Sequence, residues 1–262
     1  MIIKKFEHSF EDFGQDIIKK LNILGEYLIF TYEIIRHIFS RKLKLKHVFS
    51  QMTKIGVNSF PITAVTLLFV GMVFSNQVTH EFTKIGAGKI IGGIVGFAIW
   101  RELGPLFAGV VVAARVGAAI STEIGAMKVT EQIDALRSMA INPIVFLYVP
   151  RFLSLIFMMP LLIIFANFIG FIAGLGIYTT LYNGNPVAYI ASAANMLTPL
   201  DIYGGVLYKG PIFGFIIGSF SLYIGSKTGN GAVGIGRSAT MSVVSCLIVL
   251  FIVNFFLSYL IF

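Results

Sequence analysis

Charged residues are scarce in this chain of 262 residues: Asp, Glu, Lys and Arg make up 12% of it, against about 25% in soluble domains. None occurs in residues 152–200 or 238–262. A helix that crosses a bilayer needs about 20 apolar residues, and both runs are long enough. Hydrophobic residues reach 56% and the mean hydropathy is +0.87. These values exclude an ordinary soluble domain and predict an all-α integral membrane protein.

The sequence also lacks enzymatic motifs. Two fragments resemble a phosphate-binding loop, GAGKI (86–90) and GSKTG (225–229). The first has Ile90 in place of the required hydroxyl residue, and the second has Ser226 in place of the required glycine. Paired-histidine zinc motifs and plausible Ser/His/Asp arrangements are missing as well. We therefore expect a chain that is not an enzyme and binds no cofactor or metal itself.

Cysteine is represented by Cys246 alone, inside an apolar run. No disulfide framework is possible, and we interpret this residue as a small buried side chain. The first 60 residues hold no short apolar core followed by a small-residue cleavage site, so we expect no removable signal peptide. The net charge of +8 is interpreted as a mark of the cytoplasmic side, and no nucleic-acid partner is expected.

Five stretches are predicted to span the membrane, giving about five transmembrane helices. They lie at 57–75, 90–114, 152–181, 202–226 and 238–261. The segment before the first span and the later connections on its side hold sixteen Lys and Arg residues. The connections on the opposite side hold two, Lys84 and Lys89. Because basic residues accumulate on the cytoplasmic side, the N-terminus is predicted to be cytoplasmic and the C-terminus is not.

Residues 15–40 are too polar to span but form an amphipathic pattern. The polar residues share one narrow stripe, and most of the remaining surface is Ile, Leu, Phe and Tyr. The stripe consists of Gln15, Lys19, Asn22, Glu26, Glu33, His37 and Ser40. This pattern is typical of a helix in the membrane interface, and the basic run 41–47 suits anionic head groups. Residues 1–50 are therefore predicted to be an interfacial segment; the alternative is a soluble helix packed on a partner.

A short charged stretch, EIGAMKVTEQIDAL (123–136), stands between two very apolar parts of the chain. Thr130 is a plausible N-cap, and Pro143 would stop the helix after Asn142. One side of this helix is apolar (Val129, Ile133, Leu136, Ala140) and the other is acidic or polar (Glu131, Asp134, Ser138). A basic partner groove would attract the acidic face, whereas an anionic leaflet would repel it. We expect a cytoplasmic partner-binding helix; the alternative is a helix lying on the membrane surface.

The segment RELGPLFAGVVVAARVGAAISTEIGAMKVTEQIDAL (101–136) resembles the signature of MlaE-type permeases, also called the YrbE family. The resemblance continues in IGVNSFPI (55–62), NPIVFLYVPRFLSLIFMMPLL (142–162), LYKGPIFG (207–214) and GIGRSATMSVV (234–244). It predicts a single MlaE-type permease domain over 51–262. One position departs: where the last span of the family commonly reads Asp-Phe, this chain has Asn254. A hydrogen-bonding role survives there, but the role of an ionised carboxylate does not.

The resemblance implies a homodimeric permease of an ABC transporter in the bacterial inner membrane, with the C-terminus in the periplasm. It would work with a separate cytoplasmic ATPase, which uses the ATP, and an MCE-domain protein on the periplasmic side. The cargo would be phospholipid moved between the inner and outer membranes, which maintains outer-membrane lipid asymmetry. The charged helix would be the coupling helix that docks on the ATPase, through Glu123, Lys128, Glu131 and Asp134.

Arg101, Glu102 and Lys209 are charged residues within predicted spans. Counted from Arg115 and Lys227, the two cations lie roughly 21 and 27 Å along their helices, in the outer half of the bilayer. A charge at such a depth costs about 2.5–3.5 kcal/mol, so pairing or function is expected. One hypothesis is a cationic site for lipid phosphate between two subunits. The other is a structural Arg–Glu–Lys cluster that holds two helices together.

Two other classes of protein remain open. A secondary transporter or channel is disfavoured because no inverted repeat is visible in five spans. A membrane scaffold without transport would not need buried Arg101 and Lys209. Within the family, the cargo could instead be a sterol, a fatty acid or another lipid, and the direction of transport is not specified by the sequence.

Overall fold

The computed structural model describes residues 2–38, 45–229 and 231–262, and these residues form helices joined by short connections, with no strand among them. Five helical segments are long and apolar enough to cross a membrane. They are Leu45–Lys84, Gly88–Val129, Ile144–Tyr182, Pro199–Ser226 and Gly231–Ile261. Each contains one of the five predicted spans, so the predicted all-α membrane fold with five spans is confirmed.

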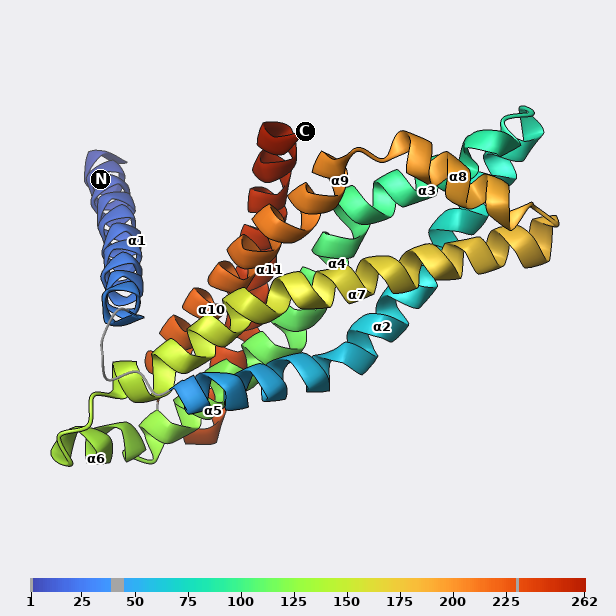
Figure 1. The fold of residues 1–262 in the computed structure, drawn as a ribbon. Coiled ribbons are helices and arrows are strands. Elements are labelled where there is room, and N and C mark those ends of the chain that lie inside the picture. Colours follow the sequence, from blue (N-terminus) through green and yellow to red (C-terminus); the bar gives the residue numbers. More distant parts are fainter. Residues whose placement is uncertain (1, 39–44, 230) are drawn as a thin grey trace.

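Within these segments the helices have the following bounds: α1 (Ile2–Ile38), α2 (Leu45–Lys84), η1 (Gly88–Ile90), α3 (Ile91–Ala98), η2 (Ile99–Leu103), α4 (Gly104–Val112), η3 (Ala113–Gly117), α5 (Ala118–Val129), α6 (Gln132–Ser138), η4 (Ile144–Tyr148), α7 (Val149–Tyr182), α8 (Pro186–Met196), α9 (Pro199–Tyr203), η5 (Gly204–Tyr208), α10 (Lys209–Ser226) and α11 (Gly231–Ile261). Helices α3 to α5 run on as one rod through η2 and η3, and η5 continues into α10 in the same way (Figure 1).

The helices are longer than the predicted spans. Helix α2 has 40 residues, which is about 60 Å of helix against a hydrocarbon core of about 30 Å. The predicted first span, 57–75, covered only its most apolar part. Polar flanks such as those around Lys54 and Glu81 continue the helix because nothing in them breaks it. One consequence is that the predicted domain boundary at 50/51 falls inside α2.

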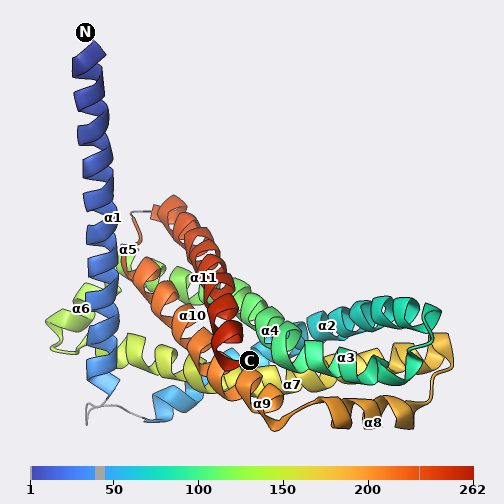
Figure 2. The same ribbon diagram turned by 90° about the horizontal axis from the view of Figure 1, so that it is seen from above.

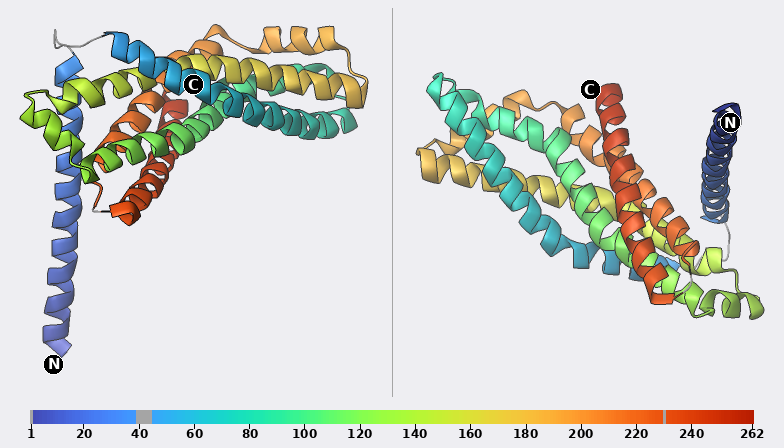
Figure 3. Two further views of the ribbon diagram at one scale, coloured as in Figure 1. Left: turned by 90° about the horizontal axis from the view of Figure 1, so that it is seen from below. Right: turned by 180° about the vertical axis from the view of Figure 1, so that it is seen from behind.

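The spans pack as a slanted bundle with two distinct ends (Figure 1). One end carries α6 and the connection from α10 to α11, while the other carries η1, α8, α9 and the C-terminus (Figures 1 and 3). Helices α2 and α7 lie side by side over much of their length. A Cβ on Gly71 would lie 2.1 Å from the carbonyl oxygen of Gly170, so this crossing requires a residue without a side chain.

Helix α1 stands at one side of the bundle (Figure 2), and its C-terminal half packs against α10 and η4. Ile34 is fully buried, and the hydroxyl groups of Tyr27 and Ser219 hydrogen-bond at 2.7 Å. Glu26, a member of the predicted polar stripe, binds the Lys227 ammonium at 2.6 Å. This hydrogen bond lowers the pKa of Glu26 and raises the pKa of Lys227. The polar stripe of α1 therefore contacts the helical bundle at Glu26.

The opposite face of α1 is apolar and exposed. Its large side chains include Leu21, Leu24, Leu28, Tyr32 and Ile35. An outward apolar face favours a position in the membrane interface, which stays a prediction. Ser40 and residues 41–44 of the basic run lie outside the described residues.

The predicted charged helix differs from the observed α6. Thr130 is not its N-cap: the Thr130 hydroxyl donates to the carbonyl of Ala126, at the end of α5. Glu131 occupies the N-cap position in the left-handed region, with φ of 58°. The helix also ends at Ser138, before the predicted stop at Pro143. The sequence pattern missed this break because the seven residues of α6 contain no glycine or proline.

Four short π-helical stretches interrupt the long helices: η2, η3, η4 and η5. Three of them are followed within three residues by a proline, namely Pro105, Pro150 and Pro211. Proline has no N–H, and its ring crowds the carbonyl group four residues earlier. This explains why the helix widens into a π-helical turn at η2, η4 and η5. The fourth stretch, η3, has no such proline.

Candidate functional site: a charged cluster within the spans

The cluster centres on Lys209, whose side chain is 0% exposed. Its ammonium donates three hydrogen bonds of 2.8 Å each, to the carbonyl oxygen of Arg101, to Oε2 of Glu102 and to Oγ of Ser258. A lysine has three N–H donors, so all of them are used. The three acceptors come from two other spans. Lys209 therefore joins η2, α10 and α11 at one point.

Glu102 receives a second donor from the last span. The side-chain amide of Asn254 donates to Oε2 of Glu102 at 3.1 Å. The hydrogen-bonding role expected for Asn254 is thus present in the structure. The amide carbonyl oxygen of Asn254 is buried and has no hydrogen-bond partner among the described residues. One carboxylate therefore accepts from both an ammonium and a neutral amide.

Arg101 is held more loosely than Lys209. Its guanidinium lies 3.9 Å from Asp201 Oδ1 and 4.0 Å from Glu102 Oε1. It also stacks 3.8 Å from the ring centroid of Phe262, a favourable position for a cation over an aromatic face. The side chain keeps 22% of its surface exposed. Arg101 is thus the cation of this cluster that retains access to a ligand.

Asp201 was not predicted as a site residue. It lies at the start of the fourth span and forms a capping box with Thr198, whose hydroxyl donates to Asp201 Oδ2 at 2.6 Å. A threonine followed three residues later by an acid, with Pro199 between them, is the signal that could have revealed this helix start. Asp201 is nearly buried, with 7% of its side chain exposed, and it supplies a second negative charge to Arg101.

Local backbone chemistry explains why these residues meet. Pro105 lacks the N–H that would bond the carbonyl of Arg101 in an α-helix, and Lys209 donates to that carbonyl instead. Gly205 permits the close approach, because a Cβ there would lie 2.3 Å from the carbonyl oxygen of Trp100. The proline and the glycine together bring η5 against η2.

An apolar hollow of about 370 Å³ lies between α2 and the η2–α4 segment, the segment that also carries Arg101 and Glu102. It is lined by Phe69, Val70, Val73, Phe74, Gln77, Leu103 and Phe107. Leu103 directly follows Glu102 in the chain. A hydrocarbon chain in this hollow would therefore contact the same rod that carries Glu102.

The predicted coupling residues separate into two places. Lys128, Glu131 and Asp134 are exposed near α6, where Asp134 pairs with Arg137 at 3.0 Å. Glu123 instead faces the bundle and forms ion pairs with Lys54 of α2 and, at 3.1 Å, with Arg151 of α7. Three of the four are therefore free to meet a partner, whereas the Glu123 carboxylate, 37% exposed, is already paired within the bundle.

The apolar face of α6 lies against the bundle. Ile133 is buried, and Leu136 packs against the same core. Ala140 does not continue this face: it is exposed and lies beyond the end of α6, with φ of 58°. The acidic side chains of the short helix therefore point away from the protein.

Together, the five spans and the charged cluster define a multi-pass α-helical membrane protein with a polar site inside its spans. The sequence model of the family described as "Permease MlaE" matches residues 48–260. A "Probable ABC transporter permease protein" of Synechocystis sp. is 40% identical over 232 residues, 88% of each chain. One from Rickettsia prowazekii is 38% identical over 251 residues, 95% of this chain and 96% of its own.

A plant relative is more distant. The chloroplastic protein TRIGALACTOSYLDIACYLGLYCEROL 1 of Arabidopsis thaliana is 33% identical over 230 residues, which is 88% of this chain and 65% of its own. The chain belongs to the MlaE permease family. It is a membrane permease.

Proposed function

We propose that this permease is the membrane-spanning subunit of an ABC transporter that moves phospholipids between the inner and outer membranes. It works as a homodimer in the bacterial inner membrane, with a separate cytoplasmic ATPase and an MCE-domain protein on the periplasmic side. The names of the bacterial relatives support the transporter class. The name of the plant relative is that of a diacyl glycolipid, which favours a lipid cargo.

The observations that carry the lipid substrate are the partly exposed guanidinium of Arg101 and the apolar hollow lined by Leu103 and Phe107 of the same rod. A phospholipid needs a cation for its phosphate and apolar surface for its acyl chains, and one rod carries both features. Of the two roles expected for Lys209 we assign it the structural one, because its three donors are already bound within the protein. Arg101 contacts the phosphate, while Lys209 and Glu102 hold the helices in place.

The homodimer is supported by the last span. Helix α11 is the least buried of the five, and it exposes a row of large apolar side chains that includes Val244, Ile248, Phe251, Phe255 and Tyr259. A second copy of the chain would cover part of this row, and lipid would cover the rest.

Reconstitution tests this function directly. The permease, its ATPase and the MCE-domain protein are placed in vesicles that contain labelled phospholipid, and transfer to acceptor vesicles is measured. Co-purifying lipid is identified by mass spectrometry. We expect bound diacyl phospholipid and transfer that requires ATP. A bound sterol or fatty acid would replace the proposed cargo. Transport driven by an ion gradient, without a retained ATPase, would support a secondary transporter.

The exposed acidic side chains of α6 are expected to transmit the motion of the ATPase. Changing Glu131→Lys and Asp134→Lys together reverses the charge that a basic groove would bind. An exposed ion pair contributes at most about 1 kcal/mol, so the double change is needed. We expect the ATPase to dissociate, or its hydrolysis to become independent of transport. Glu123 would act differently, through its ion pairs with Lys54 and Arg151.

Glu81→Lys provides the matched control for this double change, because it reverses an exposed acid in the last turn of α2, whose C-terminal end lies with η1 and α8 (Figure 1). It should retain ATPase binding. Normal ATPase binding and lipid transfer in the α6 double variant would refute the coupling role.

The orientation of the chain is also proposed, with the N-terminus in the cytoplasm and the C-terminus in the periplasm. It follows from the excess of basic residues at the end of the bundle that carries α6. Reporter fusions at Ser138 and Phe262 should give opposite signals, active in the cytoplasm at the first and in the periplasm at the second. The same signal at both positions would contradict an odd number of spans.

A further inference from the structure

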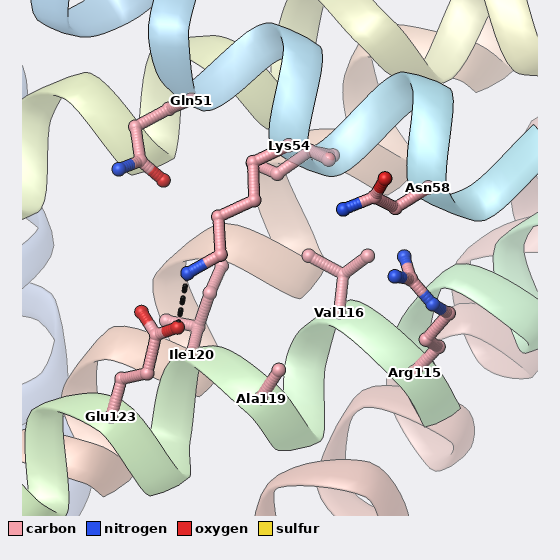
Figure 4. Close-up of a pocket in the computed structure, with 9 residues that line it drawn as sticks. Gln51, Lys54, Asn58, Arg115, Val116, Ala119, Ile120 and Glu123 are labelled. Carbon is pink, nitrogen blue, oxygen red and sulfur yellow. Dashed lines mark hydrogen bonds and ion pairs between the residues drawn. The ribbon is translucent and has the colours of Figure 1, made fainter.

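A second cavity, of about 230 Å³ and polar in part, lies between α2 and the η3–α5 segment, towards the end of the bundle that carries α6. Its polar lining consists of Gln51, Lys54, Asn58, Arg115 and Glu123, and its floor on α5 is apolar. In Figure 4 the Arg115 guanidinium and the Asn58 amide lie at one side, and the Lys54–Glu123 pair lies at the other. The cavity is separate from the Arg101 cluster, which is nearer the opposite end.

Positive charge exceeds negative charge around this cavity. Glu123 is the acid of the site, and it is already bound by both Lys54 and Arg151. Arg115 donates to the hydroxyl of Ser59 at 2.7 Å. Across the described parts of the chain, Arg115 has no ion pair. A guanidinium carries five N–H donors, so most of those on Arg115 remain without a protein acceptor.

The backbone at Arg115 provides an independent observation. Arg115 is the central residue of η3, the π-helical stretch with no proline after it. Such bulges are frequent at functional sites. The same rod places its other arginine, Arg101, in the π-helical stretch η2. The widening at Arg101 follows from Pro105, whereas the widening at Arg115 has no such local cause.

We propose that this cavity binds the phosphate group of an anionic ligand through Arg115, with Asn58 and Lys54 as further donors. The phosphodiester of a phospholipid head group in the cytoplasmic leaflet is the source favoured here, because α2, which lines the cavity, also exposes large apolar side chains on the outside of the bundle. Val57, next to Asn58, has 62% of its surface exposed. The choice of a lipid rests on the proposed function, whereas the anion site does not. A head group would bind at this site first and would reach Arg101 afterwards.

Photo-crosslinking locates the head group without requiring transport. The full chain, in complex with its ATPase in nanodiscs, is exposed to a diacyl phospholipid with a photoreactive group next to its phosphate, and labelled peptides are mapped. We expect labelling in residues 51–58 or 115–123. Arg115→Gln should reduce it about tenfold, since charge-assisted bonds to phosphate are the strong ones. Arg115→Lys should retain part of it. Diacylglycerol with the same photoreactive group should give none.

Lys89→Gln is the matched control. It removes an exposed cation in η1, directly before the far end of the rod, and the protein should be photo-labelled to the normal extent. Equal yield of the Arg115 variants and wild type shows that they fold. Undiminished labelling in Arg115→Gln would overturn the site. Loss of labelling with millimolar glycerol 3-phosphate would overturn the lipid source and assign the same site to soluble phosphate esters.

The labelling pattern also separates this inference from the proposed function. Labels confined to residues 97–107 would overturn the inner site and leave phospholipid transport standing. Labels at 115–123, in a complex that transfers no phospholipid with ATP, would overturn the proposed function and leave the inner site standing.

Discussion

Replacing Lys209 by methionine is expected to reduce the amount of folded permease in the membrane severely. The change keeps the volume of the side chain but leaves the Glu102 carboxylate without its ammonium partner, 2.8 Å away in the native protein. Removing one partner of a fully buried ion pair typically destabilises a protein by about 3–5 kcal/mol; here Lys209 is buried and Glu102 is 33% exposed, so a part of that loss is expected, together with the loss of the other two hydrogen bonds of Lys209. The measurement is the yield of purified complex and its midpoint of thermal unfolding in detergent.

A double variant, Lys209→Met with Glu102→Gln, tests the cause. It removes both charges and retains an amide at position 102 that can hydrogen-bond with Asn254. Replacing both members of a buried pair with neutral groups is often nearly neutral for stability, so yield should recover substantially. A fully stable Lys209→Met single variant would contradict the structural role assigned to Lys209.

Replacing Arg101 by alanine is expected to have the opposite effect to Lys209→Met. The complex should assemble normally, and lipid transport should be strongly reduced. Its ion pairs are long, at 3.9 and 4.0 Å, its side chain is 22% exposed, and the buried Asp201 carboxylate keeps its hydrogen bonds from Thr198, so little stability depends on Arg101. A hydrogen bond between charged groups contributes about 1.5–3 kcal/mol, which corresponds to roughly a tenfold to hundredfold loss of phosphate binding. Bound phospholipid and ATP-driven transfer are measured on the same preparations.

Two further variants sharpen this experiment. Arg101→Lys keeps the charge without the two-pronged grip of a guanidinium, so it should recover only part of the transport. Lys84→Ala, the control, removes an exposed cation at the same end of the bundle and should transport normally. Normal bound lipid and transfer in well-assembled Arg101→Ala complexes would refute the phosphate site.

The number of spans could be predicted because it depends on the length of apolar runs. A run without charges, such as 152–200, has no stable alternative to a helix in lipid, since every backbone polar group must be bonded internally. Helix ends could not be predicted in the same way. Helix α2 continues into polar flanks, and α8 (Pro186–Met196) forms in what the sequence suggested was a connection. The flanks of α2 stay helical because nothing in them breaks the helix, and α8 begins at the Asn185 cap and packs against α3.

The charged cluster was only partly predictable. Counting helical rises placed Arg101 and Lys209 at similar depth, which suggested that they could meet. It could not show that Lys209 would donate to a backbone carbonyl, nor that Asp201 and Asn254 would join. These contacts depend on the proline-induced widening at η2 and on the close approach at Gly205, where two segments about a hundred residues apart in sequence meet.

The sequence by itself determined the membrane class, the five spans and the family signature over 101–136, because each depends on composition or on local residue order. It also determined that three charges would lie within the spans. Only the tertiary structure decided which cation is buried with all its donors bound and which stays accessible to a ligand. Lys209 is buried because α10 meets η2 and α11 around it, whereas Arg101 keeps an exposed edge. That difference depends on which acceptors from distant parts of the chain surround each cation, and local sequence does not encode it.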